Sequence, residues 1–188
     1  MPSRPSYHLS GNECHLWVIL PPEIGEGLEA LTAAEQERAA RFKVEPARIQ
    51  YIRSHAAMRR ILCCYTNADI ENPTTGKPRF VASPLHFNLS HSHERALLAV
   101  TGACEVGADI EYIHRQTDGI DLAWWTRQEA CAKASGEGIR VVRDADLQSR
   151  WEVCNLDVDP DYAAAVAAAT PLRIEIRRYP FAEGDSDV

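Results

Sequence analysis

The fold of this chain is decided by the stretch FNLSHSHERALLAVTGACEVGADIE, which covers residues 87–111. Its apolar and polar residues either alternate or gather in short apolar runs, and both patterns are typical of β-strands. The turn residues His93-Glu94-Arg95 and Gly102-Ala103 separate these runs. The stretch therefore predicts an antiparallel meander of three strands, at about 86–91, 96–101 and 105–111.

Helical signals lie before and after this meander. Thr32 and Glu35 form a capping box, which predicts a helix that runs to about Phe42. Pro46 suits the first turn of a second helix, whose sequence gives one apolar and one basic face. The full set of other expected elements is a strand at 13–20, helices at about 47–64 and 123–134, strands at about 139–143, 150–157 and 172–178, and a small helix from Tyr162 to Ala169.

The order of these elements favours an α+β fold. Strand and helices come first, the meander follows, and a second group of helix and strands ends the chain. This order suggests a crude two-fold repeat with its boundary near 103–106. We expect an N-terminal lobe of residues 1–104 and a C-terminal lobe of residues 105–188, packed into one compact unit.

The composition is that of an ordinary globular protein. Of the 188 residues, 45% are hydrophobic and 25% are charged, and no run of 18 apolar residues occurs that would suit a membrane span. The N-terminal residues lack the apolar core of a secretory signal, so we expect a cytoplasmic protein. The six cysteines form no C-x-x-C pair, and we expect reduced, mostly buried thiols rather than disulfides or zinc ligands.

The charge is unevenly distributed. The net charge of −7 argues against a general nucleic-acid-binding protein. From Arg38 to Arg60, however, seven basic residues stand against the single acid Glu45. This stretch predicts either a site for a specific anionic ligand or a solvated helix face.

Asp109 and Glu111 are candidate metal ligands. They are two apart on an expected strand, so their side chains share a face about 7 Å apart. Such carboxylates repel each other unless a cation lies between them, and hard oxygen ligands suit Mg²⁺ better than zinc. The alternative is an exposed strand edge. Two observations favour the site: Ile110 is expected to point inward, and Gly107 would let another backbone approach.

Glu129 and Lys133 are four apart on an expected helix and share a face. They form either a surface ion pair or a site in which Glu129 is a metal ligand or base and Lys133 binds phosphate.

Two further residues fit a phosphate-binding site. His91 stands between two serines, which suits contact with an anion; a structural histidine, or half of a zinc site with His93, is the alternative. Lys77, in Gly-Lys-Pro, is a cation on a rigid turn. Acids for a metal and cations for phosphates together predict a magnesium and diphosphate site.

Four motifs carry a family resemblance: Gly76-Lys77-Pro78, Phe87-Asn88-Leu89-Ser90-His91-Ser92, Val106-Gly107-Ala108-Asp109-Ile110-Glu111 and Trp125-x-x-x-Glu129-Ala130-x-x-Lys133. In this order they resemble the 4′-phosphopantetheinyl transferase superfamily, of the surfactin-synthetase-activating type. The resemblance extends over about residues 12–175. It implies a monomer built as a pseudo-dimer of two similar α+β lobes, each with a small, mainly antiparallel sheet packed on helices.

The resemblance also implies a reaction. The family transfers the phosphopantetheine group of coenzyme A to a serine of an acyl or peptidyl carrier protein, and 3′,5′-ADP leaves. The roles implied by resemblance are Mg²⁺ ligands at Asp109, Glu111 and Glu129, a base at Glu129, phosphate contacts from His91 and Lys133, nucleotide contacts from Lys77 and Ser90, and a grip on the 3′-phosphate by Arg48 or Arg53.

The sequence departs from the family pattern at two places. Gln128 stands where the family usually has a lysine, and Glu111 and Glu129 are only 18 positions apart, because the connection at 112–124 is short. About a dozen extended residues still span the distance. The alternatives are a relative that binds coenzyme A or a carrier protein without transfer, and a magnesium-dependent diphosphate hydrolase.

Overall fold

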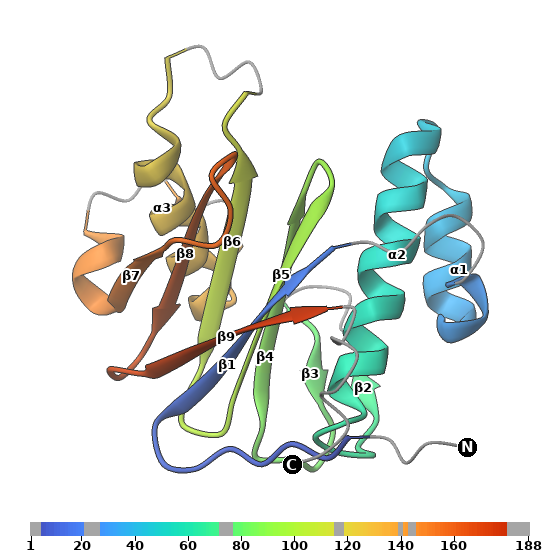
Figure 1. The fold of residues 1–188 in the computed structure, drawn as a ribbon, viewed down its shortest axis with the longest axis horizontal. Coiled ribbons are helices and arrows are strands. Elements are labelled where there is room, and N and C mark those ends of the chain that lie inside the picture. The colour runs from blue at the N-terminus through green and yellow to red at the C-terminus, as the bar shows by residue number, and fades with distance from the viewer. Residues whose placement is uncertain are drawn as a thin grey trace.

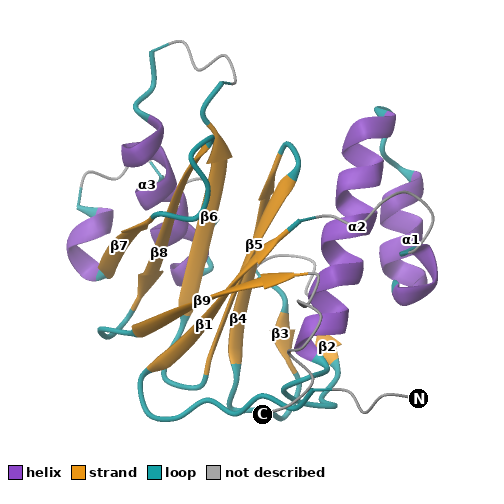
Figure 2. Cartoon of the chain, viewed as in Figure 1, coloured by secondary structure: helices purple, strands orange, loops and turns teal. Residues whose placement is uncertain are grey.

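The computed structural model describes residues 5–20, 27–71, 77–114, 119–138, 141–142 and 146–179. They form an α+β fold in which the two larger of three sheets lie between a helix pair on one side and a single helix on the other (Figures 1 and 2). The longer helices are α1 (Ala33–Ala40), α2 (Glu45–Leu62) and α3 (Leu122–Ser135). The strands are β1 (Glu13–Ile19), β2 (Ile70–Glu71), β3 (Arg79–Phe80), β4 (His86–Ser92), β5 (Arg95–Thr101), β6 (Val106–Tyr112), β7 (Glu152–Leu156), β8 (Tyr162–Ala168) and β9 (Arg173–Tyr179). The short 3₁₀ helices are η1 (Leu28–Ala30) and η3 (Leu147–Arg150).

The first sheet has the strand order β4-β5-β1-β9. Its strands pair antiparallel, except that β9, from the end of the chain, pairs parallel with β1. Every residue of β1 is buried, as expected for a strand with apolar layers on both faces. On one side, α2 packs Met58 and Ile61 into the same core as Trp17 and Leu98.

The second sheet has the order β6-β8-β7 and is covered by α3. The contact between β6 and α3 is unusually close, because a Cβ at Gly107 would lie 2.1 Å from the carbonyl oxygen of Ala130 and 2.4 Å from the amide nitrogen of Ala134. The expected backbone approach at Gly107 is thereby confirmed. This approach places the other residues on the same face of β6 against the helix.

The edge strands of the two sheets, β4 and β6, lie side by side. Side chains replace the usual backbone ladder between them: Asn88 Oδ1 accepts the Ala108 N–H at 2.9 Å, and Ser92 Oγ accepts the Tyr112 N–H at 3.1 Å. Below this junction an apolar core holds Leu16 and Leu97 of the first sheet together with Ile110 of the second. Ile110 therefore points inward, as expected.

Three expectations about the elements are corrected. The meander is wrong at its third strand, because β6 pairs along its length with β8 and opens a second sheet. The helix expected from Tyr162 to Ala169 is strand β8: alanine favours helices, but here small side chains let the strand fit between β6, β7 and α3. Of the strand expected at 139–143, Val141 and Val142 lie in a helical turn, and the other residues lie outside the described part.

All six cysteines lie in the described part and are free thiols, and Cys14, Cys64 and Cys131 are buried. None of the described helices combines the length and the apolar character needed to cross a membrane.

Candidate functional site

Asp109 occupies the centre of the site. It lies on β6 and is only 1% exposed. Its Oδ1 accepts hydrogen bonds from Ser90 Oγ at 2.8 Å and from Lys133 Nζ at 2.5 Å. Its Oδ2 is buried and has no hydrogen-bond partner among the described residues. A buried carboxylate oxygen without a donor is costly, so this atom is suited to receive a cation.

Glu111 follows on the same face of β6 and is 9% exposed. Its Oε2 accepts a hydrogen bond from Ser92 Oγ at 2.8 Å. The two carboxylates of β6 are thus each bound by a hydroxyl of β4, Ser90 for one and Ser92 for the other.

Helix α3 supplies the third acid and a cation. The helix begins after Asp121, whose carboxylate accepts hydrogen bonds from the N–H groups of Ala123 and Trp124. It ends at Gly136, which adopts the left-handed conformation with φ 73°. Within it, Lys133 Nζ lies 3.5 Å from Glu129 Oε2. Because the same ammonium contacts Asp109, it links a carboxylate of β6 with a carboxylate of α3.

His91 lies on β4 between Ser90 and Ser92, within electrostatic range of Lys133 and Asp109. Its side chain is exposed to solvent, yet enough protein surrounds it that loss of hydration is the largest cause lowering its pKa. The ammonium of Lys133 lowers the pKa further, and the Asp109 carboxylate opposes this. The lowered pKa favours the neutral form of His91, which can act as a hydrogen-bonding group.

The cations proposed for the nucleotide are more dispersed. Lys77 forms an ion pair with Glu105 and donates to the Val106 carbonyl at 3.0 Å, so the structure ties it to the start of β6. Arg48 pairs with Glu45 at 3.1 Å on the exposed side of α2. The structure therefore brings Asp109, Ser90, Glu129 and Lys133 into direct contact and leaves Lys77 and Arg48 with other partners.

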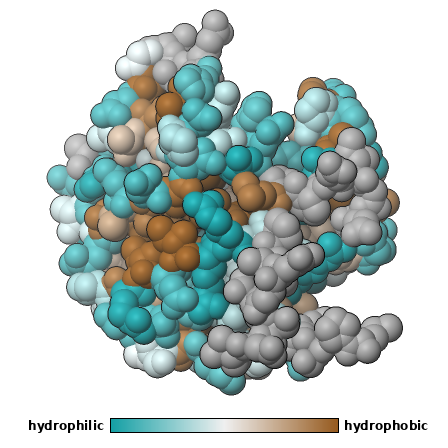
Figure 3. Space-filling view, viewed as in Figure 1, coloured by the Kyte–Doolittle hydropathy of each residue, from teal (hydrophilic) through white to brown (hydrophobic). Residues whose placement is uncertain are grey.

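Arg53 lines a large cleft of about 1100 Å³ between the first half of α2 and the β4–β5 turn. Figure 3 shows the molecule hollowed at the top, between this turn and the helix pair. Apolar side chains such as Val44 and Ile49 form one wall, and the polar turn residues form the other. This cleft is large enough for a nucleotide-sized ligand.

The chain resembles known proteins along nearly its whole length. It is 30% identical over 90% of its residues to "4′-phosphopantetheinyl transferase HetI" of Nostoc sp., of which it covers 93%. The chain belongs to the 4′-phosphopantetheinyl transferase family. It is also 32% identical, over 53% of its residues, to "4′-phosphopantetheinyl transferase AcpT" of Salmonella typhi and of Salmonella typhimurium, and covers 66% of each. No protein-family model matches the chain.

A further cation lies on the helix pair. Arg38 is exposed on α1, and its guanidinium lies 5.6 Å from the centre of the Tyr51 ring. It interacts electrostatically with His91 and with His55 of α2. It was missed as an individual residue, although it begins the basic stretch 38–60 noted in the sequence.

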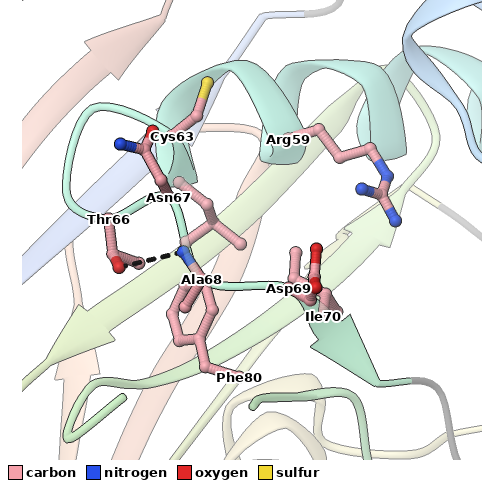
Figure 4. Close-up of a pocket in the computed structure, with 9 residues that line it drawn as sticks. Arg59, Cys63, Thr66, Asn67, Ala68, Asp69, Ile70 and Phe80 are labelled. Carbon is pink, nitrogen blue, oxygen red and sulfur yellow. Dashed lines mark hydrogen bonds between the residues drawn. The ribbon is translucent and has the colours of Figure 1, made fainter. Parts of the chain in front are cut away.

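A smaller hollow of about 200 Å³ lies at the other end of α2 (Figure 4). Among its described lining residues are Arg59, Asp69 and Phe80, and none is a predicted site residue. The guanidinium of Arg59 forms an ion pair with Glu35 at 2.6 Å. This hollow is therefore separate from the candidate active site.

The residues of the cluster fit a magnesium ion. The donor set consists of carboxylate oxygens, which Mg²⁺ prefers. The buried Oδ2 of Asp109 lacks a donor among the described residues. Glu111 follows two residues later on β6, and Glu129 lies 3.5 Å from Lys133, which binds Asp109.

Proposed function

We propose that this chain transfers the 4′-phosphopantetheine group of coenzyme A to a serine of an acyl or peptidyl carrier protein, with Mg²⁺, and releases 3′,5′-ADP. The observation that carries the proposal is the contact of Lys133 with both Asp109 and Glu129. In this family member, the contact gathers acids for a metal and a cation for phosphate at the junction of the two sheets.

In the proposal, Asp109, Glu111 and Glu129 hold Mg²⁺, which when bound withdraws charge from the diphosphate of coenzyme A. Lys133 has only 28% of its side chain exposed, so its charge acts in a partly dehydrated site, where it stabilises phosphate more strongly than in water. His91, next to Ser90 on β4, donates a hydrogen bond to the same phosphates.

Glu129 is the proposed base. Its side chain is 17% exposed, and it can take the proton from the carrier serine directly or through one water. The serine oxygen then forms a bond to the β-phosphorus, and the bond between that phosphorus and the oxygen of 3′,5′-ADP breaks. The leaving nucleotide keeps the electron pair of that bond.

The nucleotide end is assigned to the first lobe. Ser90 and Lys77 contact it, and Arg48 or Arg53 binds the 3′-phosphate. Because Arg48 already pairs with Glu45 while Arg53 lines the large cleft, we favour Arg53, with Arg38 as a further cation beside His91.

We also propose the architecture expected for the surfactin-synthetase-activating type: a cytoplasmic monomer with lobes of residues 1–104 and 105–188. Each proposed lobe contributes a sheet covered by helix. The parallel pairing of β9 with β1 then ties the end of the second lobe to the first sheet.

The alternative is a relative that binds coenzyme A or a carrier protein without transfer. The short connection at 112–124 favours it, because the family usually has a longer segment at this place. Within this connection, the side chains of Ile113, Ile120 and Trp124 are each more than 40% exposed. They offer an apolar surface whether or not transfer follows.

The test is the intact mass of an apo carrier protein after incubation with this chain, coenzyme A and Mg²⁺. The parent is expected to add one phosphopantetheine, and Glu129→Gln to reduce the rate at least a hundredfold, as loss of a general base does. Glu137→Gln, an equal change at an exposed acid just after α3, should leave the rate unchanged. A parent that binds coenzyme A but modifies no carrier would support the alternative.

A further inference from the structure

The inner face of β4 presents two hydroxyls to the two acids of β6. Ser90 and Ser92 are two apart, as Asp109 and Glu111 are, and each hydroxyl donates to one carboxylate at 2.8 Å. Ser90 has a role in the proposed site, since Lys133 Nζ also contacts its oxygen at 2.8 Å. The proposed reaction assigns no role to Ser92.

The direction of the Ser92 hydrogen bonds follows from their partners. The backbone N–H of Tyr112 only donates, so Ser92 Oγ is the acceptor at 3.1 Å. The single hydroxyl proton is then directed to Glu111 Oε2, which only accepts. The Ser92 hydroxyl thus makes two hydrogen bonds to β6, one to the Tyr112 N–H and one to Glu111 Oε2. These bonds hold one oxygen of Glu111 in place relative to the backbone of β6.

We infer that Ser92 is the positioning residue for Glu111, setting the orientation in which this carboxylate meets the metal ion. The inference rests on the proposed function. A glutamate side chain has three rotatable bonds, and fixing one oxygen removes much of that freedom before the metal arrives. Hydrogen-bond partners of metal ligands commonly account for a tenfold to hundredfold gain in metal affinity.

A purely structural role explains the contact less well. The junction of β4 and β6 is also held by Asn88, which accepts the Ala108 N–H at 2.9 Å and is 5% exposed. Ser92 is only partly buried, at the end of its strand. Its removal should therefore leave the junction closed and remove the hydrogen bond that orients Glu111 Oε2.

The experiment measures Mn²⁺ binding by electron paramagnetic resonance, with Mn²⁺ alone and with coenzyme A present. Parent, Ser92→Ala and Ser92→Thr are compared. The control is Ser54→Ala, which removes a buried hydroxyl whose bond goes to the Tyr51 carbonyl within α2. Thermal unfolding of each variant shows whether the fold persists.

We expect Ser92→Ala to weaken Mn²⁺ binding about tenfold. Ser92→Thr, which keeps the hydroxyl, should restore parental affinity, and Ser54→Ala should retain it. Unchanged Mn²⁺ affinity in a folded Ser92→Ala variant would overturn the inference, as would a parent that binds no Mn²⁺ in either condition. If the parent binds Mn²⁺ and Ser92→Ala weakens this binding, but the parent modifies no carrier protein, the inference is supported and the transferase proposal is refuted.

Discussion

At the scale of single residues, Lys133 is the cation that links two of the proposed metal ligands. Its ammonium contacts the buried Asp109 at 2.5 Å and Glu129 at 3.5 Å. Lys133→Ala would leave the Asp109 carboxylate buried with only the Ser90 hydroxyl, and breaking such a pair costs about 3 kcal/mol. We expect a lower free energy of unfolding in urea and at least a hundredfold slower transfer. A variant as stable as the parent would show that the pair contributes little.

The residue His55 should make stability depend on pH. Burial lowers its pKa from 6.5 to about 4, and its Nδ1 donates to the Tyr51 carbonyl at 3.0 Å. Between these pH values the unfolded chain binds more protons than the folded one. The free energy of unfolding therefore falls as the pH falls from about 6.5 to 4, and His55 contributes roughly 3 kcal/mol to this decrease. The lowered pKa values of His15 and His91 act in the same direction.

The measurement is urea unfolding between pH 4 and pH 8. His55→Gln should flatten the dependence, whereas substitution of the exposed His8 should not. Equal slopes for the parent and His55→Gln would contradict this account.

The spatial grouping of residues could be predicted only where spacing along one element brings them together. Asp109 and Glu111 share a strand face, and Glu129 and Lys133 share a helix face, so sequence was sufficient for each pair. The contact of Ser92 with Glu111 and the position of Arg38 beside His91 depend on how separate elements pack. No local pattern encodes such packing.

At the scale of elements, Gly107 decides how closely β6 and α3 approach. A Cβ there would lie 2.1 Å from the Ala130 oxygen and 2.4 Å from the Ala134 nitrogen, and both are backbone atoms that cannot rotate away. Gly107→Ala should separate the strand from the helix, lower the free energy of unfolding by about 2 kcal/mol and move Asp109 away from Lys133.

The matched control is Gly102→Ala, because the nearest atom to its new Cβ is Leu85 Cδ2 at 3.7 Å, an ordinary contact. Thermal unfolding and transfer rates are measured for both variants. If Gly107→Ala matched Gly102→Ala in both measurements, the close approach would not be what positions the site.

The partners of several elements were not predictable. Strand β9 was expected at 172–178, but its parallel pairing with β1 was not. Glu13 of β1 and Arg173 of β9 are register partners, and their side chains form an ion pair at 2.7 Å. Strand β8 was mistaken for a helix because alanine has a high helix propensity, whereas its place between two strands is a tertiary effect.

At the scale of the whole molecule, the basic stretch 38–60 is less positive than its sequence indicates. Four of its arginines form ion pairs within the helical part: Arg41 with Glu37, Arg48 with Glu45, Arg59 with Glu35 and Arg60 with Glu29. Three of these acids precede the stretch. We therefore expect the transfer rate to fall only moderately as salt rises from 50 to 300 mM, since few cations remain to attract an acidic carrier. A steep fall would contradict this estimate.

The proposed site depends on the junction of the two sheets, because β4 supplies His91, β6 supplies the acids and α3 supplies Glu129 and Lys133. The most direct test of transfer is to quantify 3′,5′-ADP and modified carrier in the same reaction with Mg²⁺. Equal amounts of the two products are expected, and neither product should form when the carrier or Mg²⁺ is omitted. Release of 3′,5′-ADP at the same rate without carrier would contradict this expectation and indicate a diphosphate hydrolase.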